Sequence, residues 1–285
     1  MSSESTIKQE AEVGRRHTAD IAWPTLALTL VLLVGFVAST AFALAGDLPM
    51  ACAAFTNGAI IYGCYTVFHE AVHHNIVPKR RNLRWVNAVV GSLVAVPLWM
   101  FFHHHRRSHL IHHYKTNMAE DPDLYAVGPF WQLALFQIPR TVLRYLNPVL
   151  LHRECVAFKV DHDERRLCMA LYMSYGVFVV ALIAAGFGYE LLVLWFIPWL
   201  LGNTFMLIFF AWWPHHDHAE TGRYRDTRIS LWPGGNALML GQNYHLIHHM
   251  IPSVPFYRYR AVFDELRPLL EQNNARIDGF WPTTA

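Results

Sequence analysis

The chain has 285 residues, of which 54% are hydrophobic, 14% aromatic and only 15% charged, with a formal net charge of +2. Soluble globular domains carry about 25% charged residues, so this composition excludes most soluble classes and predicts a protein embedded in a membrane. The Lys and Arg residues are interspersed rather than gathered into one basic patch, which argues against nucleic-acid binding. The four cysteines form no CxxC pair, so neither a disulfide framework nor a thiolate metal site is expected.

The apolar segments predict an all-α integral membrane protein with four transmembrane helices. A helix needs about 20 mostly apolar residues to cross a bilayer. Four segments meet this requirement: residues 23–45, 49–68, 167–186 and 191–213. We expect a polar N-terminal tail without a cleavable signal peptide at residues 1–22, the membrane domain at 23–270, and a C-terminal tail at 271–285.

Two further apolar stretches do not fit a simple span. Residues 85–102 are long enough to cross but carry Asn87 and Pro97, so a full crossing and a re-entrant or interfacial hairpin are both open. Residues 130–151 are interrupted by two arginines and two prolines. This second stretch is predicted to lie as an amphipathic segment on the membrane surface.

The basic residues predict the orientation. The turns at residues 46–48 and 187–190 contain no Lys or Arg, so the positive-inside rule places both termini and every histidine-rich segment in the cytoplasm. The expected location is the inner membrane of a bacterium. This orientation requires residues 85–102 to enter and leave on the same side, because a full crossing would put the first two histidine clusters on opposite faces.

Histidines gather in four clusters outside the apolar runs. His69 and His73 are four residues apart, and the pattern His-x-x-His-His occurs twice, so each set lies on one face of a helix. The clusters are tethered at the same membrane depth, and we expect their imidazoles to meet in a cytoplasmic helical cap. The candidate metal ligands are His69, His73, His109, His112, His113, His215, His218, His245, His248 and His249.

The type and number of these ligands indicate the metal. Neutral imidazole suits iron, copper, nickel and zinc, but a catalytic zinc takes three protein ligands and a structural zinc four. Nine or ten candidates suit two redox-active metals with open positions for O₂, and two iron ions are the expected cofactor. Acidic and amide side chains near the clusters could orient the imidazoles: Glu70, Asp121, Asp123, Asp217, Glu220 and Asn243. Five further histidines exceed the repeated spacing and are assigned no role: His74, His103, His104, His105 and His216.

Two other classes of protein are open at this point. The segment HEAVH is also the signature of a zinc protease, with Glu70 as the general base. Intramembrane zinc proteases would use it, but this hypothesis leaves the other three clusters unexplained. A metal transporter or store is the second alternative, although a transporter is expected to show repeat symmetry or helices broken at the membrane midplane.

Three longer motifs carry a resemblance to a known family. The segments HLIHHYKTNMAEDPD, WPHHDH and GQNYHLIHHMIPSVPFYRY resemble those of the membrane fatty-acid desaturase and hydroxylase superfamily, from about residue 62 to residue 268. Within it they are most similar to the desaturase-type β-carotene hydroxylases. The resemblance implies a di-iron centre on a four-span scaffold, held by the ten histidines named above. The chain departs from the pattern at Glu70, where many members have Asp, and in its extra histidines at residues 103–105.

The resemblance implies an O₂-dependent enzyme that hydroxylates an unactivated C–H bond of a lipid-like substrate, with a carotenoid ring expected first. Fatty-acyl desaturation is the alternative. The chain lacks a nucleotide fingerprint and a cysteine set for an iron–sulfur cluster, so a separate electron donor, such as ferredoxin with its reductase, is expected. We expect an amphipathic helix at residues 256–270 to close the cap, where Arg258 and Arg260 could meet the donor. Aromatic residues of the spans could line the substrate slot: Trp99, Trp195, Trp199, Phe205, Phe209, Trp212 and Trp213.

Overall fold

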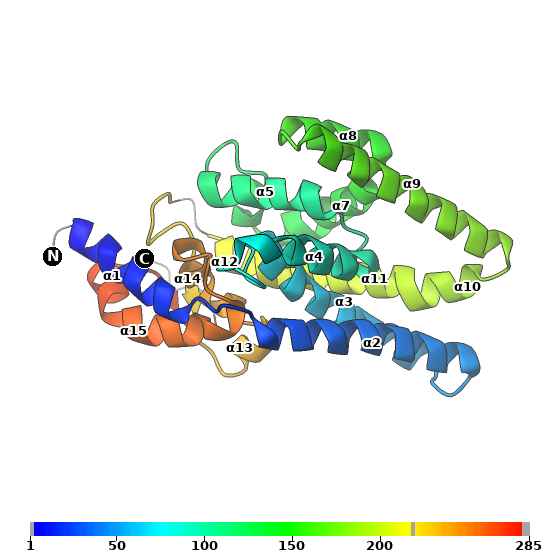
Figure 1. Cartoon of the computed structure of the whole chain (residues 1–285), viewed down its shortest axis with the longest axis horizontal. Coiled ribbons are helices and arrows are strands. Elements are labelled where there is room, and N and C mark those ends of the chain that lie inside the picture. The colour runs from blue at the N-terminus through cyan, green and yellow to red at the C-terminus, as the bar shows by residue number, and fades with distance from the viewer. Residues whose placement is uncertain (1–2, 218–219, 281–285) are drawn as a thin grey trace.

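The computed structural model describes residues 3–217 and 220–280, and nearly all of its regular structure is helical (Figure 1). Within these residues four helices are long and apolar enough to cross a membrane, as the apolar segments predict. They are α2 (Trp23–Ala45), α3 (Met50–Val72), α9 (His162–Ala184) and a continuous helix from Gly188 to His215. Both turns that join neighbouring spans lie at the end of the bundle opposite the two termini (Figure 1).

The last span changes its helical pitch twice. It consists of α10 (Gly188–Leu191), the π-helical turn η4 (Leu192–Phe196), α11 (Ile197–Met206), the π-helical turn η5 (Leu207–Trp212) and α12 (Trp213–His215). Pro198 and Pro214 each lie two residues beyond a π-helical turn. A proline ring cannot tolerate the carbonyl four residues earlier, so the preceding turn widens. The second widened turn sets the direction in which His215 leaves the helix.

Residues 85–102, the apolar stretch that carries Asn87 and Pro97, do not form one straight helix. The turn η1 (Arg81–Leu83) and α4 (Trp85–Leu98) are followed by α5 (Phe102–Lys115), and the two helical segments bend by 100° at the break. Pro97 lies in the last turn of α4, and Trp99 takes a left-handed conformation with φ of 51°. The bend fits both a re-entrant loop and a broken span, and α5 carries the second histidine cluster to the same end of the bundle as the first.

The predicted surface segment is divided into short pieces. It contains α6 (Phe130–Gln132), the π-helical turn η3 (Leu133–Gln137), α7 (Ile138–Tyr145) and the start of α8 (Pro148–Ala157), preceded by η2 (Leu124–Val127). Asn147 begins α8 by accepting hydrogen bonds from the N–H groups of Val149 and Leu150. Large apolar side chains such as Phe136 and Leu143 are exposed, which suits a segment lying against lipid.

The C-terminal part forms a helical cap over the histidine end of the bundle. It contains α13 (Gly235–Leu238), η6 (Gln242–Tyr244), α14 (His245–Met250), η7 (Phe256–Arg258) and α15 (Tyr259–Gln272), with the parallel pair β1 (Ile229–Ser230) and β2 (Ile277–Asp278). The predicted amphipathic helix corresponds to α15, whose apolar face is buried. The N-terminal tail contains α1 (Ser3–His17), which packs on α15 through Arg16 and His17 at Glu265.

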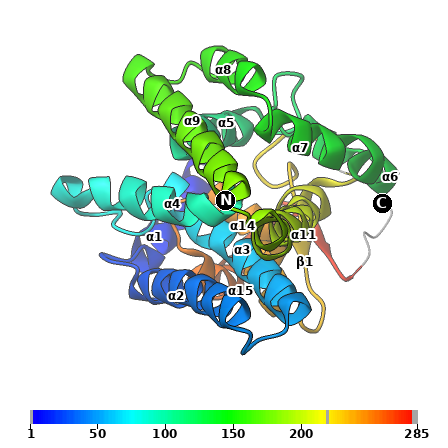
Figure 2. The ribbon, with the colours of Figure 1, turned by 90° about the vertical axis from the view of Figure 1, so that its right-hand side faces the viewer.

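The spans differ greatly in how much of their surface the protein buries. Seen along the bundle, α3 and α11 lie near the centre, whereas α2 and α9 lie toward the outside (Figure 2). The most apolar window of α3 is 61% buried inside the protein, but that of α9 is only 6% buried. The central helix therefore positions the first histidine cluster, and α9 faces lipid over most of its length.

Candidate metal centre

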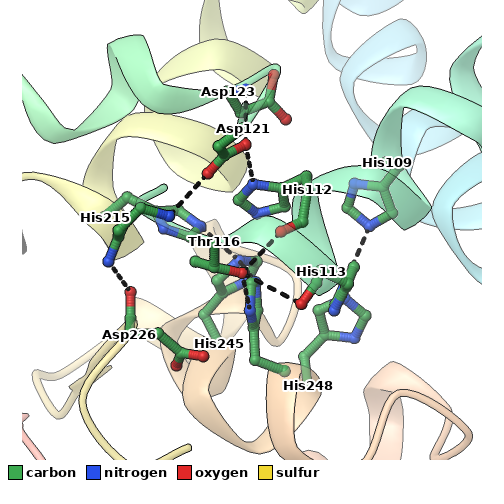
Figure 3. A network of polar contacts seen from close by, with 12 residues as sticks. His109, His112, His113, Thr116, Asp121, Asp123, His215, Asp226, His245 and His248 are labelled. Carbon is green, nitrogen blue, oxygen red and sulfur yellow. Dashed lines mark hydrogen bonds and ion pairs between the residues drawn. The ribbon is translucent and has the colours of Figure 1, made fainter. Parts of the chain in front are cut away.

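Four separate elements bring the predicted ligands together. His69 lies in the last turn of α3 and His73 is the residue that ends this helix. The second cluster lies on α5, His215 ends α12, and the third repeated motif forms α14. Figure 3 shows the imidazoles of α5 and α14 pointing toward one another.

Nine of the ten predicted ligands fall into two compact groups. In each group the ligand atoms all lie within 4.8 Å of one another. The five-histidine group consists of His69, His73, His109, His113 and His248, and the four-histidine group consists of His112, His215, His245 and His249. The two repeated motifs are each split between the groups, so the groups lie side by side. His218 lies outside the described residues.

The ring nitrogens approach one another as ligands of a cation would. His113 Nε2 lies 2.9 Å from His248 Nε2 and 3.1 Å from His109 Nε2. His245 Nε2 lies 3.1 Å from both His215 Nε2 and His249 Nε2. A neutral imidazole carries one N–H, so these contacts bring lone pairs together and cannot all be hydrogen bonds.

Unpartnered buried nitrogens point to the same conclusion. Both ring nitrogens of His69, and Nε2 of His73, are buried and have no hydrogen-bond partner among the described residues. Buried polar atoms are normally paired, so such atoms call for an explanation such as a missing ion. A metal ion in the five-histidine group would satisfy Nε2 of His73 and one nitrogen of His69. With the close approach of ring nitrogens in both groups, this fits a di-iron site.

The outward-facing nitrogens hold several rings in place. His112 Nδ1 donates to Asp121 at 2.9 Å, and His245 Nδ1 donates to the Gln242 side-chain oxygen at 2.7 Å. On α14, His248 Nδ1 hydrogen-bonds the hydroxyl of Tyr259 at 2.8 Å. Such bonds fix the tautomer, so that the other nitrogen faces the metal.

Among the predicted orienting residues, Asp121 hydrogen-bonds an imidazole of the four-histidine group. Its carboxylate also accepts hydrogen bonds from the backbone N–H groups of Asn117 and Asp123, which fixes its own position. Gln242 and Tyr259 were not predicted. Gln242 precedes His245 by three residues, so helical spacing could have identified it. Tyr259 lies on another helix, and no spacing signal connects it to His248.

The other predicted orienting residues lie elsewhere around the centre. Glu70 is fully buried and accepts from the Phe256 N–H at 3.3 Å. Asn243 donates to the Ser230 carbonyl at 3.3 Å, and the Asp217 side chain is largely exposed. The Glu220 carbonyl accepts from the Asn117 side chain at 2.7 Å. Asp123 lies in the wall of the pocket beside the groups.

The remaining histidines of the clusters have partners outside the two groups. His103 pairs with Glu164 at 2.9 Å, and His104 with Glu154 at 3.0 Å. His105 contacts Tyr65, His74 contacts Arg106, and His216 contacts Arg228. These contacts give each of the five extra histidines a role in packing that does not require a metal.

Electrostatics favour the ligand form of the three imidazoles on α14. Burial, followed by the neighbouring imidazoles, holds the pKa of His245, His248 and His249 well below the ordinary value of 6.5. These rings are therefore neutral at physiological pH, and neutral imidazole is the form that binds metals. The five-histidine group exceeds the three protein ligands of a catalytic zinc, which weighs against the zinc-protease alternative at HEAVH.

A pocket of about 50 Å³ opens beside both groups. His69, His109 and His245 contribute to its wall, together with apolar residues of α3 and α11 and polar residues of the surface segment. Three of the predicted aromatic lining residues, Trp99, Trp195 and Trp199, line a separate apolar cavity. The other four have different positions: Phe205 stacks on Phe209, the Trp212 indole donates to a backbone carbonyl, and Trp213 contacts Trp232 and Phe280.

Together the spans and the paired histidine groups define a membrane-embedded metalloprotein with a centre built for two ions. The fatty acid desaturase family model matches residues 46–281 of the chain. The chain belongs to the fatty acid desaturase family and is an oxidoreductase, as the histidine motifs predicted.

Curated relatives include enzymes that act on two kinds of lipid. The chain is 27% identical over 278 residues to the sn-1 oleoyl-lipid 12-desaturase of Picosynechococcus sp., which covers 86% of this chain and 76% of the relative. It is 28% identical over 204 residues to the β-carotene ketolase of Paracoccus sp., which covers 69% of this chain and 72% of the relative. A fatty acid conjugase of Calendula officinalis is 20% identical, covering 76% of this chain and 67% of the relative.

Proposed function

We propose that the chain is a membrane di-iron oxygenase that uses O₂ to oxidise an unactivated C–H bond of a lipid. The division of nine clustered imidazoles, six of them buried, into groups of five and four is the observation that carries this proposal. Two irons, when bound there, supply the redox chemistry for attack on a C–H bond. Hydroxylation converts one C–H bond, one O₂, two electrons and two protons into an alcohol and one water. Desaturation uses the same O₂, two electrons and two protons, removes two hydrogens from adjacent carbons, and forms two waters.

The residues of the chain prepare the centre for this reaction. Asp121, Gln242 and Tyr259 orient imidazoles of both groups through their outer nitrogens. Burial keeps the rings of His245, His248 and His249 neutral, and the apolar part of the pocket wall excludes bulk water from the reacting carbon. The proposed ligands are the nine clustered histidines together with His218.

Electrons come from a separate donor in this proposal, because the chain carries no nucleotide or iron–sulfur motif. A ferredoxin-like carrier with its reductase would dock at the end of the molecule that carries the cap, where Arg258 and Arg260 lie. The absence of Lys and Arg from residues 46–48 and 187–190 supports a cytoplasmic position for this end, in a bacterial inner membrane.

For the substrate we propose a carotenoid ring that becomes hydroxylated. The β-carotene ketolase relative supports a carotenoid, because a ketolase also oxidises a C–H position of that class of molecule. Desaturation of an acyl lipid is the second candidate, and the 12-desaturase relatives support it.

Expression in a bacterium that accumulates β-carotene, with an active electron donor, tests both candidates. Pigments and total fatty acids are separated by chromatography, and a His109→Ala strain serves as the inactive control. Hydroxylated pigment supports the leading proposal, and a new double bond in the acyl pool supports the second. If neither changes while the purified protein holds iron, both substrate proposals are wrong. A single bound zinc with peptide cleavage blocked by Glu70→Gln would instead indicate the protease.

A further inference from the structure

Two apolar cavities lie along the last span, on the side that faces α9. The far cavity, about 320 Å³, is formed by α2, α9 and α10 near the end opposite the histidines. The middle cavity, about 140 Å³, lies closer to the metal centre and is lined by residues that include Trp99, Val179 and Trp199. The pocket beside the two histidine groups, here called the histidine pocket, follows in the same direction.

The three spaces adjoin one another at shared wall residues, and the row that they form is here called the path. Leu191 and Trp195 line both the far and the middle cavities. Tyr145 lines both the middle cavity and the histidine pocket. From Leu191 to Met206, which lines the histidine pocket, the span rises by about 22 Å at 1.5 Å per residue. The path therefore crosses much of a bilayer core of about 30 Å.

The walls of the two cavities suit hydrocarbon. The indole N–H of Trp195 donates to the Pro97 carbonyl at 3.2 Å, and that of Trp199 donates to the Leu98 carbonyl at 2.8 Å. These bonds turn the polar edge of each indole toward α4 and leave apolar ring surface for the cavity. Because α9 is largely unburied, lipid of the bilayer can reach this path from the side.

The histidine pocket differs in character from the two apolar cavities. Asp123, Thr141, Ser108 and Arg144 contribute to its wall, and Arg144 pairs with Glu154 at 3.0 Å. A hydrocarbon chain pushed past the metal centre would desolvate these charged and polar groups without giving them partners, which is costly. The apolar path therefore ends at the histidine pocket.

We propose that the substrate is a long hydrocarbon that enters end first from the bilayer, with the reacting carbon at or near its terminus. The rest of the molecule lies in the middle and far cavities. Tyr145, at the junction, determines how far the end reaches and is thus a specificity-determining residue. A polyene with terminal rings and an unbranched alkane share this chemistry, whereas an acyl lipid oxidised at mid-chain does not. The inference rests on the proposed oxygenase function and deepens it.

Matched substitutions on α9 test the path. Val179 lines the middle cavity, whereas its neighbour Val180 is 65% exposed toward lipid. The iron-loaded protein in lipid nanodiscs is labelled with a hexadecane analogue that carries a diazirine at one end. We expect labelling within residues 191–199, reduced about tenfold or more by Val179→Trp and unchanged by Val180→Trp. Equal labelling of all three proteins would overturn the proposed path.

Product positions provide the second measurement. Hexadecane and β-carotene are used as separate probes. We expect hexadecane to be oxidised at its terminal carbon and β-carotene at its ring. In Tyr145→Ala we expect the distribution of oxidised positions to change. Oxidation at internal carbons, or a mid-chain double bond in nanodisc phospholipid that Val179→Trp does not reduce, would overturn end-first binding. If no lipid is oxidised, the oxygenase proposal fails, but the photolabelling still decides whether the path binds hydrocarbon.

Discussion

The two histidine groups are held in place by different means. In the four-histidine group, polar partners lie at the outer nitrogens of His112, His245 and His249: Asp121, Gln242 and, at 3.4 Å, Thr116. In the five-histidine group, His248 has such a partner in Tyr259. Neither ring nitrogen of His69 has a hydrogen-bond partner among the described residues.

Packing replaces those hydrogen bonds in the five-histidine group. The His69 ring lies between other rings, with centroid distances of 4.3 Å to His248, 4.7 Å to His109 and 6.1 Å to Phe210. Its helix, α3, is the most buried of the spans. We therefore expect substitutions that remove a hydrogen bond to affect mainly the four-histidine group. Substitutions that disturb packing should affect mainly the five-histidine group.

Removing one ligand from each group should have the largest effect. We expect His109→Ala and His245→Ala each to lose about one of two irons per chain and to reduce product formation more than a hundredfold. His103→Ala is the control, because His103 lies in the same cluster as His109 but outside both groups. Metal content and product are measured on purified protein. Full iron content in His109→Ala would contradict the assignment of the groups.

Removing an orienting carboxylate should have the next largest effect. Asp121→Asn keeps the shape but removes the charge that holds His112, and we expect iron affinity in the four-histidine group to fall about 10- to 100-fold. Tyr259→Phe removes a neutral hydrogen bond worth about 1 kcal/mol, so the iron affinity of the five-histidine group should fall about fivefold. Iron loss to a chelator, followed over time, measures both. Faster iron loss from Tyr259→Phe than from Asp121→Asn would contradict the comparison of the two groups.

A packing substitution should act on the five-histidine group. A Cβ at Gly91 of α4 would lie 2.5 Å from Phe102 and 3.0 Å from Ala71, and so would push α4 away from the helices that carry His69 and His109. We expect Gly91→Ala to destabilise the fold by about 1–3 kcal/mol. Gly176 of α9 has no such neighbour within 4 Å, so Gly176→Ala is the matched control and should not destabilise. Thermal unfolding in detergent compares them, and equal unfolding temperatures would refute the packing argument.

The weakest orienting contact should give the smallest effect. Thr116 Oγ1 donates to the His112 carbonyl at 2.8 Å and lies 3.4 Å from His249 Nδ1. Thr116→Val should lower iron affinity by about threefold or less, because a contact of this length is weak. The same chelator assay measures it. A loss as large as that expected for Asp121→Asn would show that Thr116 holds His249 more firmly than the distance indicates.

The sequence predicted the spans and the convergence of the histidines because both depend on local patterns. Apolar runs have the length of a bilayer, and residues three and four apart share a helix face. The split of each repeated motif between two groups could not be predicted, because it depends on how α5 and α14 are turned relative to each other. The partnership of Tyr259 with His248 depends on the packing of α15 under α14. The bend at residues 99–101 could only be left open, since a proline near a helix end is compatible with a kink or a stop.

The most direct test of the account is to locate the metals in the purified, iron-loaded protein by anomalous X-ray scattering at the iron edge. The account predicts two iron peaks in each molecule, one among the five histidines that include His69 and one among the four that include His245. A single peak, or a zinc held by His69 and His73 alone, would contradict it.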